Sequence, residues 1–209
     1  MICMPTIYFF GPDGSGKSTL AKAIVRKLRM QGFEAKLSWM RGTHTFASLL
    51  ARLLPNFKAF KGLDNPYYGI TIPRKLKSTW QFIEFVSILP ILFARLLIPS
   101  RLGYIVVAER SIPDFLVWVS ITTKDANYLE SFNSRFLIAL TMRAKVRIYV
   151  TAEPSELLKR RADTSPLFIQ EQLILYEKIA RDTNAFKLDT TKLSMNESLK
   201  DVLNLLNIR

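Results

Sequence analysis

A run of small and charged residues near the start of the chain has the spacing of a phosphate-binding loop. Residues 11–19 read Gly-Pro-Asp-Gly-Ser-Gly-Lys-Ser-Thr and fit the pattern G-x-x-x-x-G-K-[ST]. In such a loop the glycines let several backbone N–H groups point at one anion, at the positive end of the following helix. We expect Lys17 to reach the β- and γ-phosphates of ATP and the Ser18 hydroxyl to bind Mg²⁺. The predicted nucleotide-binding residues are Gly11, Asp13, Gly14, Ser15, Gly16, Lys17, Ser18 and Thr19.

The segments on either side of this loop fit the context that the motif requires. Residues 6–10 are a short β-branched and aromatic run, which predicts a buried strand. Residues 20–28 place Leu20, Ile24 and Leu28 on one face of a predicted helix. A strand, a glycine-rich loop and a helix in this order favour a phosphate site over a turn without a ligand.

Two later strands are expected to end beside the loop and to add charged side chains. Residues 104–108 form an apolar run typical of a central parallel strand, and Glu109 and Arg110 follow it directly. Glu109 is a candidate ligand of metal and substrate, and Arg110 a candidate catalytic and substrate-binding residue. Arg41, after a predicted strand over residues 35–40, is a candidate substrate contact. A strand-end ion pair and a solvated arginine at a turn are the respective alternatives.

A basic cluster after the predicted fourth strand, residues 146–150, is a candidate lid. Arg160 and Arg161 precede a polar turn, and a helix over residues 167–181 is predicted to follow it. A short helical lid over about 159–167 would bring both arginines onto the phosphates as catalytic residues. The alternative is a solvated basic face, which such runs often form.

An apolar stretch over residues 74–97 predicts one long helix that is kinked or broken at Pro90. Its uninterrupted apolar part is shorter than a spanning helix requires, so we expect a buried or interfacial helix and no membrane partner. Wide apolar coverage makes the helix over residues 75–98 a candidate homodimer interface. Arg74, at the start of the stretch, is a candidate substrate contact.

The region before this helix, residues 55–73, is rich in turn-forming residues and is predicted to be irregular. It combines Lys58 and Lys61 with neighbouring aromatic side chains. Such aromatics either stack on a nucleotide base or anchor a long loop to the core, and the sequence leaves both open.

The composition limits the classes to which the protein can belong. Its 209 residues suit one domain over 1–209, and a net charge of +13 attracts polyanions, which include phosphorylated small molecules. The charge is spread along the chain and no nucleic-acid-binding motif is recognisable, so we expect nucleotide substrates and no nucleic acid partner. The one cysteine, Cys3, and the missing signal-peptide pattern favour a cytoplasmic location. His44, the one histidine, has no partners for a zinc site.

Alternation of predicted strands and helices gives the fold class. A fifth strand over residues 185–189 and a helix over 195–206 close the chain, and Ser194 with Glu197 matches a capping box. We therefore expect an α/β fold of the P-loop kinase type, a three-layer sandwich. Its five-stranded parallel sheet would carry helices on both faces and a short helical lid.

The constellation resembles the P-loop nucleoside-monophosphate kinases, and within them the thymidylate kinase family. The loop at residues 11–19 is close to the family's form, in which the aspartate matched by Asp13 lies near the substrate sugar. Glu109-Arg110-Ser111 looks like the family's Asp-Arg-aromatic motif, with Glu109 in place of Asp and Ser111 in place of the aromatic residue. Arg160 and Arg161 look like its lid arginines. Only Arg41 matches the family's Arg-Glu-Pro, because Gly42-Thr43 follows it.

The resemblance implies phosphoryl transfer from Mg·ATP to a nucleoside monophosphate, dTMP to dTDP in the first place. Because the acceptor phosphate is already anionic at neutral pH, positioning and charge neutralisation suffice without a strong general base. Two alternatives are open. One is a P-loop kinase that acts on another nucleotide or on a nucleoside, and the other is a P-loop ATPase that is stimulated by nucleic acid or a membrane.

Overall fold

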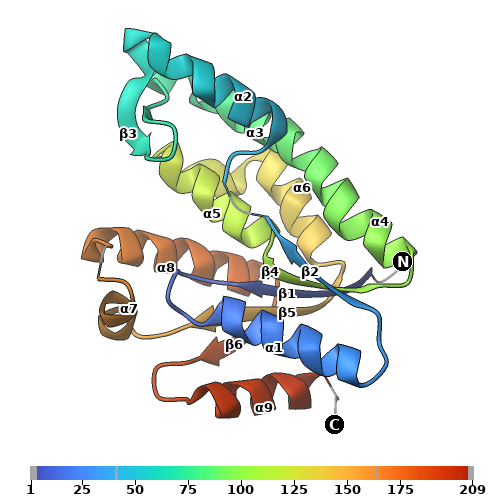
Figure 1. Cartoon of the computed structure of the whole chain (residues 1–209). Helices are drawn as coiled ribbons and strands as arrows, with labels where there is room; N and C mark the ends of the chain where they lie inside the picture. Colours follow the sequence, from blue (N-terminus) through green and yellow to red (C-terminus); the bar gives the residue numbers. More distant parts are fainter. Residues whose placement is uncertain (1–3, 41, 163, 207–209) are drawn as a thin grey trace.

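The computed structural model describes residues 4–40, 42–162 and 164–206, and its centre is one parallel β-sheet (Figure 1). The strands lie in the order β2-β4-β1-β5-β6, and every neighbouring pair is parallel. The predicted five-stranded parallel sheet is confirmed. Its strands are β1 (Met4–Phe10), β2 (Ala35–Trp39), β4 (Ile105–Arg110), β5 (Ala144–Thr151) and β6 (Phe186–Asp189).

Helices cover both faces of this sheet, as expected for strands that are apolar on both sides. On one face, Leu20, Ile24 and Val202 belong to a cluster with strand residues such as Ile7 and Ile148. A second cluster fills the opposite face. The first face carries α1 (Lys17–Met30) and α9 (Met195–Leu205), and the second carries α3 (Lys77–Leu92), α5 (Ile112–Thr122), α6 (Phe132–Thr141) and α8 (Pro166–Asp182).

The segment between β2 and β4 forms an arm that Figure 1 shows above the sheet. It contains α2 (Thr45–Leu53), a short strand β3 (Lys61–Asn65) and α3. The prediction that residues 55–73 are irregular is wrong in part, because β3 forms there and Ile70 bridges back to its two ends. Phe60 and Tyr68 pack against a buried cluster that includes Ile70 and Trp80, so these two aromatics anchor the loop to the arm's own core.

The long apolar helix is more continuous than predicted. The chain stays helical from Arg74 to Arg101, 28 residues, and α3 runs through Pro90. The irregularity comes afterwards as a π-helical segment, Phe93–Leu97, before the short α4 (Ile98–Arg101). A proline removes one i→i−4 hydrogen bond, here the one to the carbonyl of residue 86, and the helix nevertheless continues through it. By length and composition this stretch would suffice to cross a membrane, and 33% of its most apolar window is buried inside the fold.

Local sequence signals fix several helix ends. Gly32, with φ of 84°, ends α1 in a Schellman motif, in which the N–H groups of Gly32 and Phe33 donate to the carbonyls of Arg29 and Leu28. The predicted capping box at Ser194 is confirmed at the start of α9. Residues 126–141 do not form a single helix. A 3₁₀ segment (Ala126–Glu130) precedes α6, because the Ser131 side chain caps α6.

Candidate nucleotide-binding site

The P-loop curls tightly between β1 and α1. Gly11 has φ of 145°, and a Cβ atom there would lie 2.0 Å from the carbonyl oxygen of Val150 in β5, so only glycine fits. Gly16, with φ of 92°, precedes the first turn of α1. The Lys17 Nζ donates to the Pro12 carbonyl at 2.7 Å and lies 3.6 Å from the Asp13 Oδ1. The buried ammonium group of Lys17 therefore contacts other residues of the same loop. The loop lies at the positive end of α1, and such helix ends commonly bind phosphates.

A carboxylate reaches the loop from the neighbouring strand. Because β4 pairs directly with β1, Glu109 at its end lies next to Ser18, whose Oγ donates to the Glu109 Oε1 at 2.6 Å. The structure therefore brings the two predicted metal ligands together. Hydroxyl and carboxylate oxygens suit Mg²⁺, which usually takes one or two protein ligands and completes its shell with phosphates and water. Within the described ranges there is no group of three or more His, Cys, Asp or Glu residues that would form an all-protein metal site.

The second charged residue of β4, Arg110, joins the loop to α5. Its Nη2 lies 2.6 Å from the Asp13 Oδ1, and both side chains are about one-eighth exposed, at 13% and 12%. Buried Asp114 accepts hydrogen bonds from the Ser111 N–H and the Tyr176 hydroxyl, both at 3.0 Å. Burial raises the pKa of Asp114, and the charges of Lys17 and Arg110 act in the opposite direction. Asp13 therefore holds Arg110 directly, and the charge of Asp114 acts on the same guanidinium group.

Sequence reasoning missed Asp114. The signal was present, because Ser111 and Asp114 have the S-x-x-D spacing of a helix start, and the Asp114 carboxylate does accept from the backbone of Ser111. Ser111 directly precedes α5 and is its N-cap.

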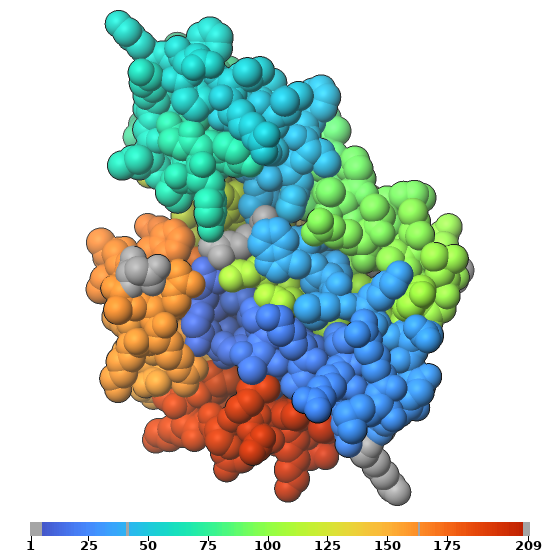
Figure 2. All heavy atoms as spheres, in the orientation of Figure 1, coloured from blue at the N-terminus to red at the C-terminus, as the bar shows by residue number. Residues whose placement is uncertain are grey.

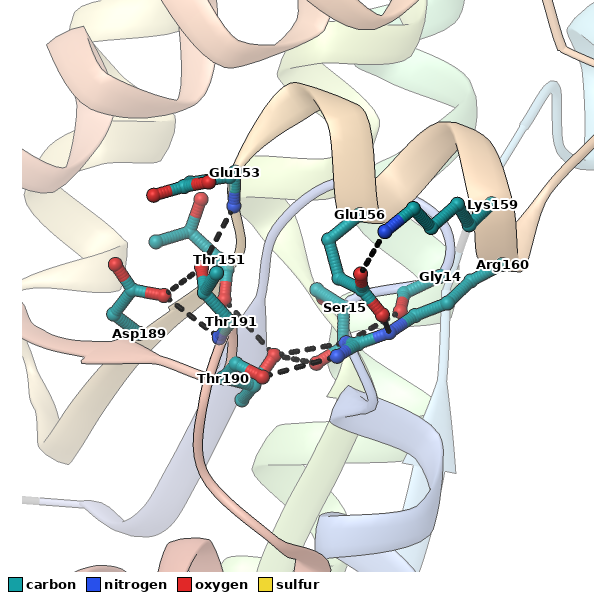
Figure 3. Close-up of polar contacts among 10 residues, drawn as sticks. All are labelled: Gly14, Ser15, Thr151, Glu153, Glu156, Lys159, Arg160, Asp189, Thr190 and Thr191. Atoms are coloured by element: carbon teal, nitrogen blue, oxygen red, sulfur yellow. Dashed lines mark hydrogen bonds and ion pairs between the residues drawn. The ribbon is translucent and has the colours of Figure 1, made fainter.

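Arg160, predicted to belong to a lid, lies against the P-loop at Gly14 and Ser15 (Figure 3). The helix α7 (Pro154–Arg160) ends there, and α8 begins at Pro166 after a turn. Arg160 contacts Glu156 through its Nε at 3.2 Å, and its two Nη atoms donate to the Thr190 hydroxyl and carbonyl at 3.1 and 3.0 Å. Its Nη1 also lies 3.3 Å from the Gly14 carbonyl. Arg161 lies against the loop as well, since a Cβ on Gly14 would be 3.1 Å from its Cγ.

Thr190 connects this lid to the loop, and Figure 3 shows it at the centre of the network. Its hydroxyl lies within hydrogen-bonding distance of the carbonyls of Ser15 and Thr151, at 3.1 and 3.0 Å, and it accepts from Arg160. Arg160 is thus a positioning residue in this arrangement: its donors hold β6, α7 and the P-loop in one geometry.

Replacing Thr190 with valine is expected to destabilise the protein and weaken ATP binding. The change keeps the shape but leaves buried polar groups without a partner, which costs about 1–3 kcal/mol of unfolding free energy. We expect a lower Tm and a higher KM for ATP, because Arg160 loses the Thr190 hydroxyl, one of the contacts that hold it against the loop. The matched control is Thr191→Val, whose hydroxyl contacts Asp189 and the Glu153 N–H instead. That variant should lose stability and keep the KM for ATP, and equal effects on KM would contradict the role given to Thr190.

The other two arginines predicted to contact substrate come from the segment between β2 and β4. Arg41, predicted to contact substrate, lies outside the described residues, and Arg74 is exposed in the turn Arg74–Leu76 that precedes α3. Figure 2 shows the surface hollowed between the arm and the α7–α8 region, next to the P-loop. A mostly apolar hollow of about 650 Å³ lies where the β3 loop, the end of α5 and α8 meet, and Phe168 and Leu175 line it.

A buried polar cluster in this arm was not predicted from the sequence. The Thr43 hydroxyl donates to the Glu84 carboxylate at 2.8 Å, and the side chains of Asn65 and Trp118 approach the same hydroxyl at 3.4 Å. Burial raises the pKa of Glu84 to about 7. No local pattern could have revealed the cluster, because its members come from four separate segments.

A comparison with known protein families agrees with the assignment of residues 11–19 as a phosphate-binding loop. The model of the ATPase family associated with various cellular activities (AAA) matches residues 7–89, less than half of the chain. The match covers β1, the P-loop and the arm as far as α3, and it ends before β4 and the lid. It implies binding of ATP and Mg²⁺ and leaves the substrate undefined. A comparison with curated proteins finds no match. Loop, sheet order and family match together identify the chain as a P-loop NTPase.

Proposed function

We propose that the protein transfers the γ-phosphoryl group of Mg·ATP to a nucleoside monophosphate. The observation that supports this most is that the carboxylates around the loop already have hydrogen-bond or ion-pair partners. Each carboxylate there is already engaged: Glu109 by Ser18, Asp13 by Arg110, and Asp114 by Tyr176. A hydrolase has to orient and activate water, whereas an anionic acceptor phosphate needs no base.

The cations fit the same reaction. Lys17 lies in the loop, Arg110 pairs with Asp13 of the loop, and Arg160 and Arg161 lie against Gly14. Catalysis would consist of holding two anionic phosphates together and neutralising the charge between them. In this scheme Ser18 and Glu109 hold Mg²⁺, and the metal when bound neutralises phosphate charge.

The test is ADP production from Mg·ATP, measured with and without each ribo- and deoxynucleoside monophosphate at one salt concentration. The account predicts a low basal rate that one class of monophosphate raises. The resemblance to thymidylate kinases makes dTMP one acceptor to include, and guanine, adenine, cytosine and uracil nucleotides complete the panel. A rate that no monophosphate changes would contradict the proposal.

One second function is favoured by the family match over residues 7–89, which names an ATPase family. A P-loop ATPase with a net charge of +13 would be stimulated by a polyanion, with a steep dependence on salt. The same assay distinguishes the two functions when nucleic acid and anionic vesicles are added in place of the acceptor. For both functions we propose a cytoplasmic location.

We further propose a homodimer through the long helix. Phe82, Val86 and Phe93 are 55%, 44% and 54% exposed, and their spacing puts them on one face of α3 and its π-helical extension. On neighbouring α6, the Phe136 ring packs edge-on against Phe85 at 5.8 Å. In a chain of net charge +13 this uncharged stripe is a surface on which two copies can meet without charge repulsion.

Replacing Phe82 with glutamate is therefore expected to halve the molecular mass in solution. The wild type should behave as two chains in size-exclusion chromatography with light scattering, and the variant as one. The control is Phe33→Glu, another half-exposed phenylalanine (50%) that follows α1 on a different part of the surface. A monomeric wild-type protein would rule the interface out.

A further inference from the structure

One side of α2 exposes large apolar side chains along its whole length. Phe46, Leu49 and Leu53 are 67%, 60% and 53% exposed, and their spacing of three and four residues places them in one row along the helix. Phe57, 60% exposed, continues the row beyond the end of α2. We call these residues the α2 stripe. A different side of α2, which includes Ala47, packs into the arm's own core.

The apolar surface continues beside the α2 stripe into a hollow between α2 and α3. The hollow has a volume of about 130 Å³, and Leu50, Leu54 and Leu76 are among the mostly apolar side chains that line it. Leu50 and Leu54 directly follow Leu49 and Leu53 of the stripe, and Leu76 is itself 41% exposed. Single exposed apolar side chains are ordinary, but several in one region mark a surface that binds a partner.

The same part of the chain is strongly basic. Residues 45–83 contain six Lys and Arg residues and one acidic residue, Asp64. Asp64 pairs with Lys124, outside this segment, at 2.8 Å. Five of the six basic residues are exposed, and within the described ranges none of the five pairs with an acidic side chain; they are Arg52, Lys58, Lys61, Arg74 and Lys75.

This combination of exposed apolar and basic side chains favours one kind of partner. An anionic membrane surface offers acyl chains to the apolar residues and negatively charged headgroups to the basic ones. Nucleic acid would satisfy the cations, but its polar and hydrated surface does not bury leucine side chains. A second copy of the chain would bring the basic residues of one arm against those of the other, which repel.

We propose that the arm binds the surface of an anionic membrane through the α2 stripe. In this arrangement α2 lies parallel to the bilayer, and the basic residues beside the stripe contact the lipid headgroups. Figure 1 shows α2 on the side of the arm that faces away from the sheet, so a membrane at α2 would leave the P-loop open. The membrane contact is independent of the proposed function.

The expectation of no membrane partner concerned a spanning helix. It was based on the length of the apolar stretch 74–97, whereas a helix that lies on the surface needs an exposed apolar face and basic neighbours. Exposure cannot be read from the sequence alone. In the structure α3 packs on α2 through buried Trp80, so α2 and not the long helix carries the proposed contact.

The experiment measures sedimentation of the protein with two kinds of vesicle. One contains phosphatidylserine and phosphatidylcholine in equal parts, and the other contains phosphatidylcholine alone. Each Lys or Arg near an anionic surface strengthens binding by about five-fold, so we expect binding to the anionic vesicles to be stronger by at least about 10-fold. This difference should shrink at high salt, which screens the charges.

The double substitution Leu49→Glu with Leu53→Glu tests the α2 stripe. Both side chains are more than half exposed, so the Tm should stay close to that of the wild type. Binding to the anionic vesicles should fall by about 100-fold or more, because two apolar contacts are lost and two negative charges face the lipid. The matched control is Met30→Glu with Phe33→Glu, the same change of charge at two exposed apolar residues near the end of α1. It should bind nearly as the wild type does.

A second pair of substitutions tests the basic residues. Arg52→Gln with Lys58→Gln removes two charges beside the α2 stripe and should weaken binding to the anionic vesicles by about 25-fold. Lys22→Gln with Arg26→Gln removes two exposed charges from α1 and should weaken it far less. If the glutamate pair in the stripe does not fold, this comparison decides the same question, because it changes only exposed polar groups.

Several results would overturn the proposal. Absence of sedimentation with the anionic vesicles would show that the arm does not bind a membrane. Equal weakening by each pair and its control would show that net charge alone attracts the protein. Binding of single-stranded DNA but not of vesicles, weakened by Arg52→Gln with Lys58→Gln, would make the surface a nucleic acid site. Because the measurement is binding and not turnover, a failure of the kinase assay leaves it unaffected.

Discussion

Alanine in place of Lys17 is expected to abolish turnover while the protein stays folded. The ammonium group is the one cation held inside the P-loop by the loop itself, 2.7 Å from the Pro12 carbonyl. Removing one preorganised hydrogen-bond donor from an active site costs about 10²–10³-fold in kcat. Because the donor lost here is charged, we expect kcat to fall by at least the larger of these factors. The fold should survive, because Asp13 keeps its closer partner Arg110, 2.6 Å away.

The measurement combines steady-state ADP production with the Tm of the variant. Lys22→Ala is the matched control, because Lys22 lies on the exposed face of the same helix, away from the loop. That control should keep the wild-type rate. Turnover within a few-fold of wild type in Lys17→Ala would show that the loop does not carry the reaction.

Replacing Arg110 with alanine is expected to reduce both stability and turnover. Asp13 would keep Lys17 at 3.6 Å as a partner, and buried Asp114 would lose one of the two cations that act on it. Breaking a buried ion pair from one side typically costs about 3–5 kcal/mol of unfolding free energy. Loss of an arginine that neutralises transition-state charge can cost about 10³–10⁵-fold in rate.

The two effects can be separated with Arg110→Lys. A lysine restores the charge between Asp13 and Asp114, so most of the stability should return, but it lacks the planar fork that holds a phosphate. We expect near-normal denaturant unfolding with turnover still low. The stability loss of Arg110→Ala should also shrink at acid pH, because protonated carboxyl groups no longer need a cation. Arg147→Ala is the control, since Arg147 binds the carbonyls of Met142 and Ala144 instead. Full activity in Arg110→Lys would mean that charge alone suffices.

The catalytic loop and its neighbours could be predicted because their signals are local. The P-loop pattern fixes its own geometry, and the rule that parallel strands end at one edge placed Glu109 beside Ser18 although 91 residues separate them. The capping box at Ser194 is likewise contained within four residues.

The features that were missed depend on contacts between distant segments. Thr43 and Glu84 are 41 residues apart, and Asp114 and Tyr176 are 62 apart, so neither pair leaves a local pattern. The strand β3 was not predicted, because turn-forming residues surround it in the sequence. Its partner in the structure is a residue outside the named strands, Ile70, which bridges to both of its ends. Helix continuity through Pro90 was also not predicted, because an interior proline usually kinks or breaks a helix and the sequence does not show that packing keeps this one intact.

The central claim is that the γ-phosphoryl group goes to a nucleotide and not to water. The most direct measurement follows the label from [γ-³²P]ATP in the presence of Mg²⁺ and the full panel of nucleoside monophosphates, and separates the products by chromatography. The account predicts labelled nucleoside diphosphate, formed by the wild type and absent with Lys17→Ala. Label found only as inorganic phosphate, with every monophosphate unchanged, would contradict it and make the protein an ATPase.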